Sequence, residues 1–331
     1  MRVLVTGGAG FLGLYLTEQL VARGDEVRCL CRGSYEELST LGVETIQGDI
    51  RDSRLVDTAT SDCDVVFHTA GVAGIWGPRR TYFEINTRGT QNVIAACWNN
   101  RVPRLVYTSS PSVTFDGTSQ DGVNESVPYP SQWLCHYPHS KALAEQQILA
   151  ANGQRGLLTC ALRPHLIWGP RDRHLIPRLL ERARRGRLRR VGAGRNLVDM
   201  IYVENAADAH LLAADALLPS APVCGHAYFI SQGEPVNCWN WIDDILTLAG
   251  LPVVDKSISF PAAWRLGRLC ETVYRLTGIQ REPPMTRFLA SQLATNHYFD
   301  ISQARRDFGY HPRISTQSGM QRLRQALQPQ S

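Results

Sequence analysis

The sequence predicts an α/β protein with a doubly wound parallel sheet and a smaller C-terminal lobe. Three observations indicate this fold class. Short apolar runs alternate with helix-period stretches, a glycine-rich turn follows the first run, and the alternation becomes irregular after residue 164. Strands that alternate with helices form right-handed βαβ units, which place helices on both faces of a parallel sheet.

Six runs have the length and the apolar, β-branched character of buried strands. They are residues 2–6, 26–31, 43–47, 64–69, 104–109 and 158–163. Residues 227–231 predict a further buried strand, so we expect the chain to leave the sheet and return to it. Helical stretches are expected at 14–22 and 239–249, and a loop at 116–130.

Composition is typical of a globular chain, with 44% hydrophobic and 20% charged residues among 331. No apolar run reaches the roughly 18 to 20 residues that a membrane span needs. The first residues lead into a strand rather than a signal peptide, so we expect a cytoplasmic protein. The nine cysteines show no metal-ligand spacing, which predicts reduced thiols and no metal site.

The net charge of +5 is concentrated in residues 178–190. Helical spacing places Leu179, Leu180 and Ala183 on one stripe, with arginines around it. This pattern is typical of a solvated amphipathic helix and does not by itself indicate a nucleic-acid partner. Peripheral contact with a membrane surface is the alternative.

A glycine turn follows the first predicted strand. Gly7, Gly10 and Gly13 permit a tight turn, close approach of the backbone to a pyrophosphate and tight helix packing, and Phe11 and Leu12 lie within this turn. Strand, turn and helix in this order predict a Rossmann fold that binds a dinucleotide. We therefore expect a dinucleotide-binding domain at 1–165, rejoined by about 198–235, and a substrate-binding lobe at 166–197 and 236–331.

The end of the second strand bears on the nicotinamide form. An acidic residue there binds a ribose 2′-hydroxyl, whereas an arginine accommodates a 2′-phosphate. Residues 29–34 contain no acid but do contain Arg32. The sequence therefore favours NADP(H), with NAD(H) as the alternative if Arg32 is only a solvated loop charge. Asp49 and Ile50, just after the third strand, are expected to meet the adenine.

Tyr137 and Lys141 lie four residues apart at the head of a helical stretch, and hence on one helix face. A nearby cation lowers the pKa of a phenol and makes it a usable acid and base. Thr108, Ser109 and Ser110 end the fifth strand, where open α/β sheets bind ligands. These hydroxyls could orient a carbonyl or alcohol oxygen beside Tyr137.

Ordered motifs across the whole chain resemble those of the extended short-chain dehydrogenases. They are TGGAGFLG, FHTAG, YFEINTRGTQNVI, VYTSS, YPHSK and LRPHLIWGP. The resemblance implies that Tyr137 is the general acid and base, that Lys141 binds the nicotinamide ribose, and that Ser110, or alternatively Ser109, holds the substrate oxygen. It further implies cofactor contacts from Thr69, Ala70, Gly71, Asn86 and Pro164. It also implies a homodimer formed through the helices that contain Asn92 and Lys141.

Within this family, Val198 stands where nucleotide-sugar enzymes usually carry an arginine that pairs with the substrate diphosphate. The loss of such a contact disfavours a nucleotide sugar, although Arg195 could partly substitute. Segments near residues 170–210, 226–245 and 297–315 are similar to the 3β-hydroxysteroid dehydrogenase branch. Residues 70–86 look most like reductases of 2-alkyl-3-oxoalkanoic acids and sterol-4α-carboxylate 3-dehydrogenases.

The resemblance implies an apolar small-molecule substrate that carries a carboxylate. Four aromatic residues could wall the substrate, or could simply pack the lobe: Trp76, Tyr82, Trp133 and Trp168. Four cationic or titratable residues are candidates for the carboxylate, and the sequence does not rank them: Arg79, Arg173, His139 and His165.

The leading prediction is an NAD(P)-dependent oxidoreductase that interconverts a ketone and a secondary alcohol on a bulky β-keto or β-hydroxy acid. Oxidation of a 3β-hydroxysteroid carboxylate is the alternative. A nucleotide-sugar epimerase or dehydratase is a more distant one. A non-catalytic, dinucleotide-binding regulator is opposed by the intact Tyr137 and Lys141.

Overall fold

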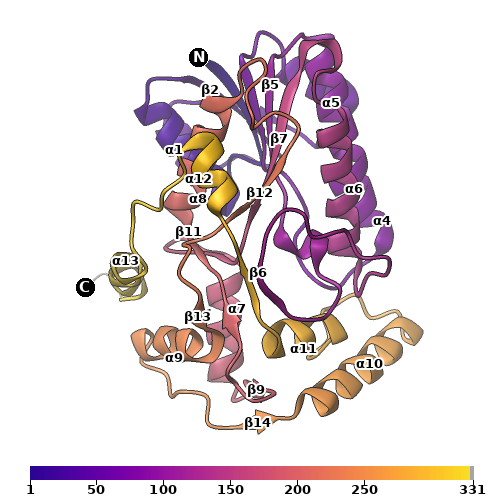
Figure 1. Ribbon diagram of the computed structural model, residues 1–331, viewed down its shortest axis with the longest axis vertical. Coiled ribbons are helices and arrows are strands. Elements are labelled where there is room, and N and C mark those ends of the chain that lie inside the picture. The colour runs from indigo at the N-terminus through magenta and orange to yellow at the C-terminus, as the bar shows by residue number, and fades with distance from the viewer. Residues whose placement is uncertain (329–331) are drawn as a thin grey trace.

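The computed structural model describes residues 1–328, and its centre is a seven-stranded parallel sheet (Figure 1). The strand order is β12-β7-β5-β4-β1-β2-β3. The strands are β1 (Arg2–Thr6), β2 (Glu26–Cys31), β3 (Glu44–Gln47), β4 (Val65–His68), β5 (Arg104–Thr108), β7 (Leu158–Pro164) and β12 (Ala227–Ile230). The structure confirms the predicted fold class, and each strand ends within one residue of its predicted bound.

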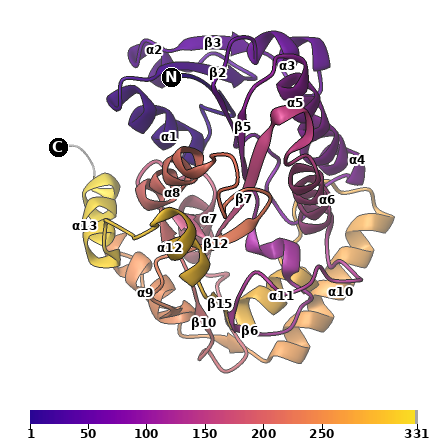
Figure 2. The same cartoon turned by 45° about the horizontal axis from the view of Figure 1, so that its top comes forward.

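Helices cover both faces of this sheet, as the two views show (Figures 1 and 2). One face carries α1 (Phe11–Ala22) and α8 (Val203–Ala216), which contact each other. The other carries α3 (Ser53–Ala59), α5 (Gly89–Asn99) and α6 (His136–Ala150). The central strands β1, β4 and β5 bury side chains on both faces because both faces are covered, whereas the edge strand β3 is mostly exposed.

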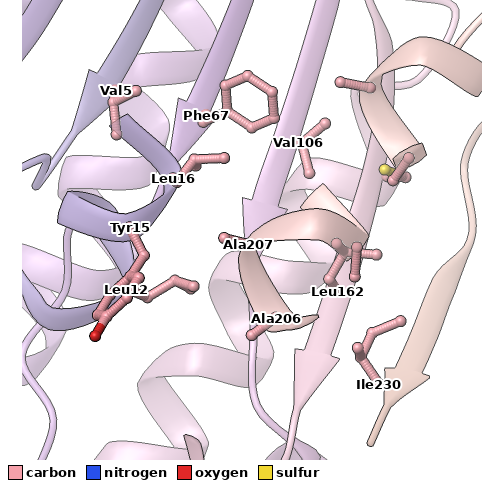
Figure 3. Close-up of a cluster of buried hydrophobic side chains, with 14 of the residues drawn as sticks. Val5, Leu12, Tyr15, Leu16, Phe67, Val106, Leu162, Ala206, Ala207 and Ile230 are labelled. Carbon is pink, nitrogen blue, oxygen red and sulfur yellow. The ribbon is translucent and has the colours of Figure 1, made fainter. Parts of the chain in front are cut away.

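The alternation of side chains along β1 divides the core into two clusters. Val3 and Val5 pack with α1 and α8, where Figure 3 shows Leu12, Leu16 and Ala206 converging on the sheet. Leu4, between them in sequence, points to the opposite face and packs with α3, α5 and α6. Side chains of the single strand β1 therefore contribute to the core on both faces of the sheet.

The remaining elements complete the sheet domain and form the lobe below it (Figure 1). The short helices are α2 (Glu36–Thr40), α4 (Arg79–Tyr82), the π-helical turn η1 (Phe83–Arg88), η2 (Pro111–Thr114), η3 (Gln154–Gly156) and α12 (Ser302–Phe308). The longer ones are α7 (Leu175–Arg184), α9 (Cys238–Leu248), α10 (Phe260–Leu276), α11 (Arg287–Ala294) and α13 (Thr316–Leu327). The minor strands are β6 (Gln120–Val123), β8 (Ile167–Trp168), β9 (Arg190–Val191), β10 (Leu197–Val198), β11 (Ile201–Tyr202), β13 (Val236–Asn237), β14 (Ser257–Ile258) and β15 (His297–Phe299). Residues 329–331 of the predicted lobe lie outside the described residues.

The segment predicted as a loop at 116–130 contains strand β6. Its sequence, QDGV, has no apolar alternation, so local pattern could not reveal it. The strand forms because β15, almost 180 residues later, pairs with it in parallel, with His297 opposite Gln120. Tertiary pairing thus overrides local propensity here.

The basic segment 178–190 is only partly the solvated helix that the sequence predicts. Helix α7 buries Ile176 and Leu180, as its spacing requires. However, Arg178 and Arg182 both contact Glu282, a partner about a hundred residues away. Across residues 1–328, no helix has the length and apolarity needed to cross a membrane.

Candidate active site

The glycine turn joins β1 to α1 and leaves backbone amides free. Gly7 has a φ of +74°, and its carbonyl accepts a hydrogen bond from the amide of Gly10 at 2.8 Å. A Cβ on Gly13 would lie 2.2 Å from that carbonyl oxygen, so only glycine permits this packing. No side chain within residues 1–328 caps α1 at Gly10. The helix N-terminus can therefore receive an anion such as a pyrophosphate.

A groove of about 430 Å³ begins at this turn. Most residues that the sequence assigns to the dinucleotide line it: Gly7, Gly10, Phe11, Arg32, Asp49, Ile50, Thr69, Ala70 and Gly71. Gly13 and Leu12 lie behind the turn, where Leu12 is part of the core. The donors and shape of the groove fit a dinucleotide.

Charged side chains lie at the end of the groove where the sequence predicts that adenosine binds. Arg32 is exposed just beyond β2, with Tyr35 nearby in the groove wall. Asp49 accepts hydrogen bonds from the side chain of Arg51 at 2.9 and 3.0 Å, which holds the pKa of its carboxyl below the ordinary value. Tyr35 is a groove residue that the sequence analysis did not single out.

Asn86 does not line the groove. It lies in the π-helical turn η1, where its Oδ1 accepts from the Val72 amide at 2.8 Å and its Nδ2 donates to Ser140 Oγ at 3.0 Å. Asn86 is buried, and it connects the segment after β4 to helix α6. The structure therefore places it as a residue that positions the wall behind the cofactor groove.

A second cavity, of about 360 Å³, shares a wall with the groove. Phe11, Thr69 and His174 are among the residues that border both. The second cavity also contains the side chains expected to carry out chemistry: Ser110, Tyr137, Lys141 and Pro164. The structure thus brings Tyr137, Lys141 and Ser110 together where the two spaces join.

Lys141 is buried inside this cavity wall. Its Nζ donates to the carbonyl oxygen of Thr108 at 2.6 Å and lies 4.1 Å from the ring centroid of Tyr107. Desolvation lowers the pKa of Lys141 to about 7, and Glu145 opposes this shift. Burial therefore disfavours the charged form of Lys141, whereas a nearby anion would favour it.

Tyr137 and Ser110 line the same cavity. Burial raises the pKa of the Tyr137 phenol, and hydrogen bonding with the Ser110 side chain opposes this effect. Ser110 also shares a hydrogen bond with Ser112, with 2.9 Å between their hydroxyl oxygens. Ser109, the alternative, is buried, and its Oγ finds no partner within residues 1–328. Both serines line the cavity, and Ser110 is the one whose side chain lowers the pKa of Tyr137.

The segment after β8 closes one side of both spaces. The guanidinium of Arg171 donates to Glu18 of α1 at 2.6 and 2.8 Å, and Arg173 donates to Glu37 of α2 at 2.8 Å. His174 follows and borders the groove and the cavity. The sequence analysis did not assign this segment to the dinucleotide. Its position depends on ion pairs between residues that are more than 130 positions apart in the sequence.

The four aromatic residues proposed as substrate walls lie outside this cavity. Trp168 is fully buried in the lobe core, and Trp133 stacks on His139 with 5.2 Å between ring centroids. The hydroxyl of Tyr82 donates to the backbone oxygen of Trp76 at 2.9 Å. Trp168 therefore packs within the lobe, as the alternative stated, whereas Trp133 and Tyr82 contact residues of the first 165.

Other apolar residues line the cavity instead. They are Phe115, Leu166, Ile167, Leu175, Phe288 and Phe299, among others. They come from segments that are far apart in sequence and that follow no common motif. Only the path of the chain in three dimensions brings them together, so no sequence signal could have found them.

Of the four candidates for a substrate carboxylate, only His165 lines the cavity. Arg173 pairs with Glu37, Arg79 covers the ring of Phe83 at 4.2 Å, and His139 stacks on Trp133. Val198 is buried, and Arg195 is exposed outside the cavity. Among the described residues, no arginine lines this space, as a diphosphate would require.

The chain is similar to curated bacterial reductases over nearly its whole length. It is 49% identical to a 2-alkyl-3-oxoalkanoate reductase of Shewanella oneidensis, over 98% of this chain and 86% of that protein. It is also 49% identical to a protein of the same name from Stenotrophomonas maltophilia, over 98% of each chain. A 3beta-hydroxysteroid-dehydrogenase/decarboxylase isoform of Arabidopsis thaliana is 36% identical over 96% of this chain and 78% of that one.

Solved structures share the fold. The structure of MoeE5 in complex with UDP-glucose and NAD superposes with a TM-score of 0.76 at 25% identity, covering 98% of each chain. Residues 4–262 match the 3-beta hydroxysteroid dehydrogenase/isomerase family. This match covers most of the chain and agrees with the named relatives, which are reductases and dehydrogenases. The chain therefore belongs to the 3-beta hydroxysteroid dehydrogenase/isomerase family and is an oxidoreductase.

Proposed function

We propose that this protein reduces the 3-oxo group of a 2-alkyl-3-oxo acid with NADPH. One observation carries the proposal: Tyr137, Lys141 and Ser110 meet where a dinucleotide-shaped groove joins an apolar cavity. The identity of 49% to two 2-alkyl-3-oxoalkanoate reductases supports the same substrate class.

The residues of the chain have distinct roles in this proposal. Bound reduced nicotinamide supplies the hydride. Ser110 and the Tyr137 hydroxyl hold the substrate oxygen, and Tyr137 donates the proton that converts it to an alcohol. Lys141, charged when the site is filled, binds the ribose and lowers the pKa of Tyr137. The apolar residues of the cavity exclude water from the reacting carbon.

Arg32 supports the choice of NADPH. It is exposed at the end of β2, in the wall of the groove, at the position where a 2′-phosphate would lie. No acidic side chain within residues 29–34 competes for a ribose hydroxyl. NADH stays the alternative, and the structure of MoeE5, for example, was solved with NAD.

Oxidation of a 3β-hydroxysteroid carboxylate is the second candidate. The family match and the 36% identity to a plant dehydrogenase/decarboxylase favour it. Both candidate substrates carry an oxygen-bearing carbon β to a carboxylate, and both need an apolar cavity.

Three further expectations belong to the proposal. Helices α5 and α6 contact each other on one face of the sheet and are proposed to form a homodimer interface with a second copy. The nine free cysteines support a reducing, cytoplasmic location. The cofactor is proposed to bind to residues 1–165 and 198–235, and the substrate to the lobe.

The test is reduced-nicotinamide absorbance with purified protein and a 2-alkyl-3-oxo acid generated in place. We expect the reduced cofactor to be oxidised faster when it is NADPH than when it is NADH. If neither cofactor is consumed while a 3β-hydroxysteroid carboxylate is oxidised, the second candidate replaces the first.

A further inference from the structure

Two histidines in the substrate cavity have no role in the proposed reaction. His165 follows the end of β7, and His297 begins β15. Both line the cavity that contains Tyr137 and Lys141. Their rings meet edge to face, with 4.8 Å between centroids and 80° between planes. The two segments are distant in sequence, so this pair is a product of the tertiary fold.

Hydrogen bonds fix which nitrogen of each ring carries hydrogen. The Nδ1 of His165 lies 2.7 Å from the backbone oxygen of Asp199, and the Nε2 of His297 lies 2.7 Å from that of Gln292. A carbonyl oxygen only accepts, so these two nitrogens are the donors. Among residues 1–328, His165 Nε2 forms no hydrogen bond, and His297 Nδ1 is the nitrogen of the pair that is buried without a partner.

An unpartnered buried nitrogen costs free energy, so it calls for an explanation. A ligand that places a negative oxygen beside the pair provides one. The pair can then take up a proton and present a cationic N–H to that oxygen.

The other ionisable groups of the cavity are already engaged or lie elsewhere in it. They are Tyr137, Lys141, Asp172 and His174. Lys141 donates to Thr108, and the oxygens of Asp172 accept from the amides of residues 174, 175 and 176 at the start of α7. His174 is exposed at the wall shared with the groove. Next to the pair, one oxygen of Asp199 accepts from the Phe299 amide, whereas the other is buried without a partner within residues 1–328, and burial raises the pKa of this carboxyl to about 6.

We propose that His165 and His297 form the subsite that binds the substrate carboxylate, with His165 Nε2 as the contacting atom. The inference rests on the proposed function, since it assumes a substrate that carries a carboxylate. Around the pair, Phe288, Phe299 and Leu166 provide apolar surface for the alkyl chains. One charged group within an apolar cavity matches the chemistry of an acid with long alkyl chains.

Burial also explains why the subsite is neutral before the substrate binds. It lowers the pKa of His165 well below the ordinary value and that of His297 to about 4. A carboxylate beside the pair raises these pKa values, because it stabilises the charged form. Binding therefore takes one proton from solvent, and a neutral substrate of the same shape takes none.

The experiment compares oxidation of a 2-alkyl-3-hydroxy acid with oxidation of its methyl ester, by the wild type and by His165→Asn. Asparagine keeps an N–H for the Asp199 carbonyl but has no group in place of Nε2. The kcat/KM ratio of acid to ester should fall about tenfold in the variant, mainly through the KM of the acid. His226→Asn, at an exposed histidine outside the cavity, is the matched control and should leave the ratio unchanged.

A second measurement does not depend on turnover. Calorimetry of the hydroxy acid binding to the wild type with NADPH, in two buffers of different ionisation enthalpy, should show uptake of about one proton at pH 7.5. The same titration with His165→Gln, which replaces the imidazole if His165→Asn does not fold, should show about one proton less, because any uptake by Lys141 is common to both proteins. Equal proton uptake by both proteins, or none by the wild type, contradicts the subsite.

The outcomes separate this inference from the proposed function. A wild type that oxidises neither acid nor ester, with NADP⁺ or NAD⁺, contradicts the proposed function itself. A wild type that oxidises the acid, together with an unchanged ratio in His165→Asn, contradicts only the carboxylate subsite.

Discussion

The cofactor groove and the substrate cavity share one wall but are built in different ways. The groove is formed largely by backbone and small residues at the carboxyl ends of β1, β2 and β4, and its rim charge, Arg32, is exposed. The cavity is formed by side chains from distant segments, and it buries Lys141, His165 and His297. In the proposed function, the groove fixes the position of the cofactor through local shape, and the cavity carries the chemistry through its desolvated ionisable groups.

The largest expected effect tests whether chemistry is confined to the cavity. Tyr137→Phe removes the proton donor and should lower kcat by about 10³, within the usual range for general acid catalysis. Because the groove is untouched, fluorescence titration should show NADPH affinity within twofold of the wild type. Tyr274→Phe, in α10 outside the cavity, is the control. Unchanged turnover in Tyr137→Phe would remove Tyr137 from the mechanism.

The second prediction tests whether the close packing of the glycine turn is needed to bind the cofactor. Gly13→Ala places a Cβ 2.2 Å from the Gly7 carbonyl oxygen, so the turn must shift. The expected cost is about 2 kcal/mol in the free energy of unfolding, with a parallel loss of NADPH affinity. Gly33→Ala is the control, because its nearest neighbour would lie at 3.6 Å. A Gly13→Ala protein with the stability and affinity of the wild type contradicts the packing argument.

The third prediction concerns the buried charge of the cavity. Lys141 has a pKa of about 7 in the folded chain and an ordinary value of 10.5. Between these values the unfolded chain holds a proton that the folded chain lacks, so this group makes the protein more stable as pH rises from 7 towards 10.5. Relative to Lys141→Met, the wild type should gain about 2 kcal/mol between pH 7 and pH 9.

Denaturant titrations at both pH values measure this gain in protein without cofactor. Lys256→Met, at the exposed second lysine, is the control and should follow the wild type. If wild type and Lys141→Met change in parallel with pH, Lys141 is not the buried group described here.

The smallest effect is expected at the exposed rim of the groove. Arg32→Ala should raise the KM for NADPH about tenfold and leave that for NADH within twofold, because only NADPH carries the 2′-phosphate. Arg54→Ala, an exposed arginine of α3 outside the groove, is the control. Equal effects on both cofactors would remove the basis for preferring NADPH.

The sequence predicts the groove well because local motifs build it. The groove is lined by residues of the turn 7–13 and by strand ends at residues 32, 49 and 69–71. The local sequence determines the backbone geometry of each of these segments. Ser110, Tyr137 and Lys141 line one cavity, as expected for residues on one helix face and one strand end. The seven-stranded sheet follows from the alternation of strand and helix.

The cavity wall could not be predicted, because its residues meet only through long-range pairing. His297 reaches the cavity because β15 pairs with β6 and β10, and β6 has no strand pattern of its own. Trp168 and Trp133 looked equally suitable as wall residues in the sequence, yet they pack elsewhere. Aromatic composition alone does not indicate which surface a side chain faces.

The measurement that tests the central claim most directly follows the hydride. The protein is given NADPH in which both hydrogens at C4 of the nicotinamide are replaced by deuterium, together with a 2-alkyl-3-oxo acid, and the product is analysed by mass spectrometry. The account predicts a 3-hydroxy acid with deuterium bonded to C3 and matching oxidation of the cofactor. A product without deuterium, or unreacted cofactor, would contradict a net ketone reduction by this protein.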